Sequence, residues 1–306
     1  MTSPATLRNV QARQRALPDL RRTLSLPLNT ESFLGKIAKS GTPYLAQRKV
    51  RSAMLSISDL YLSFGGIKAL QGVSFDAKEG EITGVIGPNG AGKTSLFNAI
   101  SGFYAPNRGT VTFDGSDITG ISPDKRASLG MARTFQNIAL FRGMTVLDNI
   151  KLGGHTRLNT GLFSSFKYFG SARREELELR RDIEERVIDF LEIDHIRKYP
   201  ITMLSYGLQK RVELARALAM KPRVLLLDEP VAGMNREETA DMARFILDVQ
   251  EQFGTTILLV EHDMHMVMDI CSHIVVLNFG QQIASGTPAE VSQNPAVIEA
   301  YLGAAA

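Results

Sequence analysis

Apolar residues along the chain fall into two patterns. Some form short uninterrupted or alternating runs of strand length, and others recur every three or four positions, as in an amphipathic helix. The strand-like runs lie at residues 55–57, 60–62, 73–77, 82–87, 111–113, 224–227 and 256–260. The helix-like stretches lie at residues 94–100, 208–220 and 237–252. Strands that alternate with helices in this way predict an α/β fold with a mostly parallel sheet.

The segment from about residue 140 to 203 is rich in charged residues and is predicted to be helical. Leu179, Ile183, Val187 and Leu191 recur at intervals of four residues. This spacing places all four on one face of a helix, and we expect that face to be buried.

Charge is distributed unevenly between the start of the chain and the rest. Residues 1–51 contain ten Lys and Arg but two Asp and Glu. The rest of the chain contains 25 Lys and Arg and 30 Asp and Glu. Pro4, Pro18, Pro27 and Pro43 interrupt this basic segment. We interpret it as a mobile, solvated extension. An Arg-rich start with few acids is also typical of organellar transit peptides, and a basic patch would also suit anionic lipid head groups.

Composition limits the classes of protein that fit. The chain has 306 residues, of which 44% are hydrophobic, enough for one large domain with appendages. The net charge of +3 does not favour a nucleic-acid partner. A single cysteine, Cys271, precludes an intramolecular disulfide and fits a reducing cytosol. No apolar run approaches the roughly 20 residues of a membrane span, so we expect any membrane role to act through partners.

Residues 87–94 match the phosphate-binding P-loop pattern, GxxxxGK[ST], between a predicted strand and a predicted helix. The glycines let backbone N–H groups surround phosphate oxygens, and the helix N-terminus attracts anions. We expect Lys93 to reach the β- and γ-phosphates and the Thr94 hydroxyl to bind Mg²⁺. The predicted nucleotide-binding residues are Gly87, Pro88, Asn89, Gly90, Ala91, Gly92, Lys93, Thr94 and Ser95. A Gly-rich turn without a ligand is the alternative, which eight matching positions disfavour.

An apolar run ending in two carboxylates supplies a second part of a hydrolytic site. Asp228 and Glu229 follow Val224–Leu227 directly. Two acids at a buried strand end are costly without cationic partners, so we expect partners nearby. Asp228 is predicted to bind Mg²⁺. Glu229 is predicted to polarise the attacking water as a general base.

The segment Leu204-Ser205-Tyr206-Gly207-Leu208 precedes a predicted helix and lies about twenty residues before the acidic strand end. It resembles the signature of ABC ATPases, usually LSGGQ, from which Tyr206 and Leu208 depart. Ser205 offers a small hydroxyl and Gly207 an unhindered N–H, and the resemblance implies that both bind a γ-phosphate. A Ser that only caps a helix, with no ligand, is the alternative.

Three further residues resemble functional positions of the same family. Gln136 resembles the Q-loop glutamine, which contacts Mg²⁺ or the water and couples the site to a helical subdomain. His262 resembles the switch histidine that contacts the γ-phosphate. Phe64, ahead of Gly65-Gly66, resembles the aromatic residue that stacks on adenine, although a core phenylalanine would also suit its strand.

A different interpretation of the region around His262 is a metal site. Glu261, His262, Asp263 and His265 all carry potential ligand atoms. No cysteine partner and no known ligand spacing supports this alternative, so we disfavour it.

The resemblance narrows to the ATPase subunits of branched-chain amino-acid ABC importers. Residues 134–136, 229–235 and 260–264 are similar to that group, and so is the C-terminal tail at 279–303. Asn235 stands where most ABC ATPases have aspartate, and it is similar to one of the two ATPase types of this importer family.

The resemblance implies a P-loop NTPase fold, with a RecA-like core, an antiparallel β-subdomain and an α-helical subdomain. The ABC nucleotide-binding domain would span residues 54–303. Its antiparallel part would comprise residues 54–80 and 110–118, and its helical subdomain residues 137–215. The C-terminal tail would begin near residue 279.

The implied activity is ATP hydrolysis with ATP and Mg²⁺, coupled to membrane transport. The implied catalytic residues are Glu229, His262, Gln136 and Lys93. The implied metal ligands are Thr94, Gln136 and Asp228. Two ATPase subunits, identical or different, would meet head to tail. Two membrane permeases and an extracytoplasmic binding protein would be the other partners, with the ATPases on the cytoplasmic face of the plasma membrane.

Other functions stay open at this point. Related ATPases serve amides, urea or lipid export. Translation factors of this superfamily usually have two ATPase domains and repair ATPases have long coiled-coil insertions, and this sequence shows neither feature. A non-hydrolysing regulatory protein is disfavoured because Lys93, Glu229 and His262 are all present.

Overall fold

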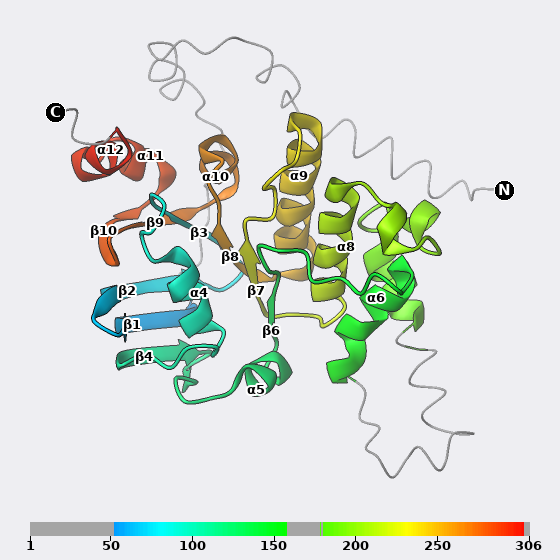
Figure 1. Ribbon diagram of the computed structural model, residues 1–306, viewed down its shortest axis with the longest axis horizontal. Helices are drawn as coiled ribbons and strands as arrows, with labels where there is room; N and C mark the ends of the chain where they lie inside the picture. The colour runs from blue at the N-terminus through cyan, green and yellow to red at the C-terminus, as the bar shows by residue number, and fades with distance from the viewer. Residues whose placement is uncertain (1–51, 158–177, 179, 303–306) are drawn as a thin grey trace. The chain divides into compact units, whose positions relative to one another are not determined.

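The structure, a computed structural model, describes residues 52–157, 178 and 180–302 (Figure 1). The predictions for the basic extension at 1–51 and for Leu179 fall outside these residues. Two β-sheets form the framework, one antiparallel and one mostly parallel.

The antiparallel sheet has four strands in the order β2-β1-β4-β5. Its strands are β1 (Ala53–Phe64), β2 (Ile67–Lys78), β4 (Arg108–Phe113) and β5 (Ser116–Asp117). The two apolar runs expected at 55–57 and 60–62 belong to one strand, β1. They are separated by an irregularity at Asp59, whose φ of 50° shifts the pairing register with β2 between Ile57 and Leu60.

The second sheet has six strands in the order β10-β9-β3-β8-β7-β6. They are β3 (Ile82–Ile86), β6 (Met131–Arg133), β7 (Val224–Asp228), β8 (Thr256–Val260), β9 (His273–Asn278) and β10 (Gln281–Gly286). All neighbours pair in parallel except β10 with β9. Every residue of β3, β7 and β8 is buried, as their uninterrupted apolar sequences predict.

Helices connect and cover the strands. They are α4 (Lys93–Ile100), α5 (Pro123–Ser128), α6 (Val146–Gly153), α8 (Tyr206–Leu218), α9 (Arg236–Phe253), α10 (Met264–Ile270), α11 (Pro288–Ser292) and α12 (Pro295–Leu302). Single helical turns lie at Gly154–Arg157, Glu184–Ile188, Asp194–Ile196 and Ile201–Met203. Within the described residues, no helix combines the length and apolar character that crossing a membrane requires.

The core consists of two apolar clusters, because side chains of the six-stranded sheet alternate between its faces. Leu225 belongs to a cluster shared with α6, α8, α9 and α10. Leu226 belongs to one shared with α4 and the antiparallel sheet, so α4 packs between the two sheets. Ile183, Val187 and Leu191 are buried in the first cluster, which confirms their predicted burial, although Leu191 lies in a turn beyond the helical residues that end at Ile188.

The parallel direction of the strands determines which edge of the six-stranded sheet carries the predicted site residues. Strands β3, β7 and β8 run in the same direction, so their carboxyl ends lie at one edge of the sheet. Ligands of open α/β sheets bind at this edge. The loop after β3, the acids after β7 and His262 after β8 therefore meet there.

Candidate active site

The loop between β3 and α4 is held tightly by its neighbours. A Cβ atom on Gly87 would lie 2.1 Å from the carbonyl oxygen of Leu277, and one on Gly92 would lie 2.6 Å from that of Ala69. Both glycines also have positive φ angles, 152° and 101°. These positions therefore exclude any side chain, and the predicted P-loop takes a backbone path that only glycine permits.

Lys93 begins α4 with its side chain folded back over the loop. The residue is only 7% exposed. Its Nζ donates to the carbonyl oxygens of Gly87 at 2.6 Å and Pro88 at 3.0 Å. Burial lowers the pKa of Lys93, while the negative charges of Glu229 and Asp228 oppose this effect. The predicted phosphate-binding cation thus lies within electrostatic reach of the two acids after β7.

The side chain of Glu229 contacts two other predicted site residues. Its Oε2 accepts a hydrogen bond from Nε2 of Gln136 at 2.9 Å, and its Oε1 lies 2.8 Å from Nε2 of His262. The three residues come from segments about 30 and 90 positions apart in the chain. The structure thus brings the predicted base, Q-loop glutamine and switch histidine into direct contact.

The backbone of Glu229 is unusual for a residue with a side chain. Its φ is 50°, in the left-handed region, and its N–H donates to the carbonyl of Val260 at 2.9 Å. Such a conformation costs about 1–3 kcal/mol and clusters at functional sites. Here it turns the carboxylate of Glu229 toward Gln136 and His262, immediately after the last residue of β7.

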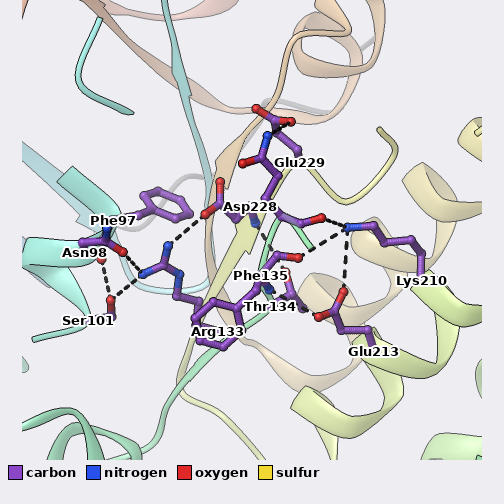
Figure 2. Close-up of polar contacts among 11 residues, drawn as sticks. Phe97, Asn98, Ser101, Arg133, Thr134, Phe135, Lys210, Glu213, Asp228 and Glu229 are labelled. Carbon is purple, nitrogen blue, oxygen red and sulfur yellow. Dashed lines mark hydrogen bonds and ion pairs between the residues drawn. The ribbon is translucent and has the colours of Figure 1, made fainter. Parts of the chain in front are cut away.

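Asp228 ends β7 and has the cationic partner that its burial requires. Arg133, the last residue of β6, donates from Nη2 to Oδ2 of Asp228 at 2.9 Å, with side chains 7% and 4% exposed (Figure 2). Thr134 accepts a 3.3 Å hydrogen bond on Oγ1 from the backbone N–H of Asp228. Neither Arg133 nor Thr134 was predicted as a site residue. The two acids at a buried strand end called for a cationic partner, but no local pattern identified Arg133 as that partner.

A second buried ion pair fastens the segment around Gln136 to α8. Lys210 donates from Nζ to the carbonyl oxygen of Gln136 at 2.9 Å, and lies 3.8 Å from Oε2 of Glu213 (Figure 2). Glu213 accepts from the N–H of Phe135 at 3.4 Å. Burial raises the pKa of Glu213, and the charge of Lys210 is the largest effect opposing that rise. Neither residue of this pair was predicted to belong to the site.

The predicted signature segment begins α8. Ser205 is the N-cap residue, and its side chain accepts from the N–H of Leu208 at 3.3 Å. A Cβ atom on Gly207 would lie 2.4 Å from Oε1 of Glu238, so a side chain here would displace the Glu238 carboxylate at the start of α9. Helices α4 and α8 lie apart in Figure 1, with β6 and β7 between them. One chain therefore does not bring its signature segment to its own P-loop.

Phe64 lies at the end of β1 and is 42% exposed. The alternative of a core phenylalanine is therefore wrong. Its ring meets that of Tyr104 edge to face, with the centroids 5.0 Å apart. This geometry is favourable for aromatic pairs and leaves part of the Phe64 ring accessible to a ligand.

Glu261, the acidic residue directly after β8, accepts hydrogen bonds from backbone N–H groups. Oε1 of Glu261 accepts from the N–H of Val231 at 2.9 Å, and Oε2 accepts from that of His262 at 2.9 Å. Among the residues that the structure describes, no group of three or more His, Cys, Asp or Glu side chains is arranged to hold a metal by itself. Glu261 thereby links the segment after Glu229 to His262.

Comparison with known proteins agrees with this geometry. The family described as ABC transporter matches residues 70–232, and the family described as branched-chain amino acid ATP-binding cassette transporter matches residues 281–306. The high-affinity branched-chain amino acid transport ATP-binding proteins BraF of Pseudomonas aeruginosa and LivG of Escherichia coli are each 41% identical to this chain. The alignments cover 82% of it and 98% of each relative.

Two solved structures have the same fold. A nucleotide-free ATP-binding cassette from an ABC transporter superimposes with a TM-score of 0.72 and 33% identity, over 82% of this chain and all of that one. The ADP conformation of an ATP-binding cassette of an ABC transporter superimposes with a TM-score of 0.72 and 34% sequence identity. This match covers 82% of this chain and 99% of that one. The predicted P-loop NTPase fold is confirmed. The chain belongs to the ABC transporter family, as an ATP-binding cassette that binds and hydrolyses ATP.

Proposed function

We propose that this ATPase energises an importer of branched-chain amino acids. Two relatives that are 41% identical carry that function in their names, and this chain covers 98% of each. The match of residues 281–306 to the branched-chain amino acid family adds support from a separate part of the chain. We assign the nucleotide-binding domain to residues 54–303 and its helical subdomain to residues 137–215.

The contact of Gln136, Glu229 and His262 carries the proposed mechanism. In it, the Glu229 carboxylate accepts a proton from the attacking water. Gln136 holds one oxygen of this carboxylate, and His262 holds the other and then donates to the γ-phosphate. The positive charge of Lys93 contacts the β- and γ-phosphates, and the ring of Phe64 stacks on the adenine of ATP.

The oxygen atoms at this edge of the sheet suit Mg²⁺, which prefers hard oxygen ligands. The Thr94 hydroxyl, the Asp228 carboxylate and the Gln136 amide oxygen would hold it. Oδ1 of Asp228 receives no hydrogen bond from the described residues, so this oxygen is available to a cation. When bound, Mg²⁺ would neutralise charge on the phosphate oxygens.

We further propose that two ATPase subunits form the complete site, with Ser205 and Gly207 of one subunit at the phosphates of the other. The separation of α4 and α8 within one chain supports this arrangement (Figure 1). The subunits would act with two membrane permeases and an extracytoplasmic binding protein, on the cytoplasmic face of the membrane.

Reconstitution tests this proposal. The ATPase, purified together with its permeases, is placed in liposomes with the binding protein, and ATP-dependent uptake of labelled leucine is measured. We expect uptake that stops in a complex carrying Glu229→Gln. Uptake of urea or short amides, with none of leucine, isoleucine or valine, would contradict the substrate proposed.

A further inference from the structure

Arg133 links three parts of the nucleotide site through one side chain. It ends β6, where its backbone pairs with Leu226 of β7. Its Nη2 donates to Asp228, and its Nη1 donates to Oδ1 of Asn98 and to Oγ of Ser101, each at 2.7 Å (Figure 2). Asn98 lies in α4 and Ser101 caps the end of that helix. The guanidinium thus connects the helix that starts at the P-loop with the acidic end of β7.

Aromatic rings surround the guanidinium of Arg133. Its charged group lies over the rings of Phe135, Phe97 and Phe103, at 5.1, 5.7 and 5.9 Å from their centroids. Cations over aromatic faces are attracted most strongly where water is excluded, and this side chain is 7% exposed. Nε of Arg133 is buried without a hydrogen-bond partner, so the other two nitrogens define the orientation.

The fixed guanidinium also fixes the carboxylate that it contacts. Oδ2 of Asp228 is occupied by Arg133, and Figure 2 shows the other oxygen directed away from the guanidinium. An aspartate with free rotation about its side-chain bonds would present either oxygen, in many directions. The pairing removes that freedom and leaves Oδ1 in one place.

We propose that Arg133 is a positioning residue that holds Asp228 in the orientation required to bind Mg²⁺. This inference rests on the proposed role of Asp228 as a ligand of the cation. Groups that orient a metal ligand are typically worth 10- to 100-fold in metal affinity. Lysine at position 133 would keep the positive charge but would lack the planar fork that reaches Asp228, Asn98 and Ser101 together.

Arg126 provides a matched control. It is 1% exposed and donates to carbonyl oxygens at the end of the same helix, at 2.9 Å to Ala99 and at 2.5 Å to Ile100. The contacts of Arg126 do not include Asp228. Arg126→Lys should therefore disturb the fold around α4 as Arg133→Lys does, without altering the cation ligand.

The experiment measures Mn²⁺ binding to the full chain in the presence of ADP, by electron paramagnetic resonance, alongside ADP affinity in EDTA by calorimetry. Arg133→Lys should weaken Mn²⁺ binding roughly 10- to 100-fold with the metal-free ADP affinity unchanged. Asn98→Ala, which removes one partner of the guanidinium, should weaken Mn²⁺ binding less, and it carries the test if Arg133→Lys does not fold. Arg126→Lys should leave both affinities at the wild-type values.

Asp228→Asn distinguishes a failure of the proposed metal site from a failure of the inference about Arg133. If it leaves Mn²⁺ binding unchanged, Asp228 is not a ligand and the inference about Arg133 is overturned together with the proposed metal site. If Asp228→Asn weakens Mn²⁺ binding and the variants at Arg133 and Asn98 do not, the inference alone is overturned. An equal loss of Mn²⁺ affinity in Arg126→Lys and Arg133→Lys would show a structural effect, and would also overturn it.

Discussion

Replacing Lys210 with methionine should destabilise the fold strongly, because it leaves a buried charge without its partner. The side chains of Lys210 and Glu213 are 2% and 1% exposed, and their charged atoms lie 3.8 Å apart. Glu213 would keep the backbone N–H groups of Phe135, at 3.4 Å, and of Ala139, and the guanidinium of Arg216 at 3.9 Å. Breaking a buried pair from one side costs about 3–5 kcal/mol, and a domain of this size loses roughly 2–4 °C in Tm per kcal/mol. We therefore expect a Tm lower by about 10 °C.

The pH dependence of this loss has a definite sign. Burial raises the pKa of Glu213, and removing Lys210 takes away the largest opposing effect, so the pKa rises further in the variant. A carboxyl whose pKa is higher in the folded state contributes stability below its unfolded pKa, and this stability is lost as the pH rises through the folded pKa. The Tm deficit of Lys210→Met should accordingly shrink as the pH falls from 8 toward 5.

The assay is thermal unfolding followed by circular dichroism, for three variants at several pH values. Lys210→Met with Glu213→Leu removes both charges, and this pair should recover most of the lost Tm because Glu213 no longer stands as a buried carboxylate without Lys210. Glu213→Gln serves as the control that keeps the shape of the side chain. A double variant as unstable as Lys210→Met, or a deficit that does not change with pH, would refute the reasoning.

Four other predictions concern the proposed nucleotide site. Glu229→Gln should bind ATP as the wild type does in calorimetry and hydrolyse it roughly 10²–10⁴-fold more slowly in a phosphate-release assay, the usual contribution of a positioned base; wild-type turnover would exclude Glu229 as the base. Lys93→Ala should lose tight ATP binding in the same calorimetry, because the phosphates lose their cation, whereas unchanged affinity would remove Lys93 from the site. Gly207→Ala should lower the free energy of unfolding by about 1 kcal/mol in urea titrations, because the new methyl group displaces Glu238 from the capping box of α9, and in a Glu238→Ala background the same change should cost nothing further. Specific ATPase activity of the wild type should rise with protein concentration and should stay low at all concentrations in Ser205→Arg; activity that is constant where light scattering shows only monomer would contradict the composite site.

The central chemistry was predictable because it is encoded locally. The P-loop needs glycine at fixed places, and its backbone path shows why: Gly87 and Gly92 lie against carbonyl oxygens of other strands. Asp228 and Glu229 stand directly after an apolar run, and parallel strands place such ends at one edge. Position along the chain and strand direction are therefore sufficient to predict that these residues meet.

The ion pair of Arg133 with Asp228 and the contact of Lys210 with Gln136 could not be predicted, because they depend on packing between distant segments. Arg133 pairs with an acid 95 positions away, and Lys210 contacts a carbonyl group 74 positions away. The strand that ends at Arg133 has three residues, too few to show an alternating pattern. A charged residue in an amphipathic helix or at a strand end is usually solvated, so nothing local distinguishes these side chains from surface ones.

Residues 133–136 connect the acids that follow β7 to helix α4 at one end of the segment and to helix α8 at the other. Arg133 at its start is bound to α4 and to Asp228, and Gln136 at its end is bound to Glu229 through its side chain and to Lys210 of α8 through its backbone. The two carboxylates that follow β7 are therefore each held by one end of this segment. A shift of α8 would move the carbonyl that Lys210 holds and would therefore displace Gln136, the partner of Glu229, while Arg133 would keep Asp228 in place. If Asp228 and Glu229 have the proposed roles, a movement of α8 could alter water activation at Glu229 without any change in the P-loop, because the two carboxylates are held by different ends of the segment 133–136.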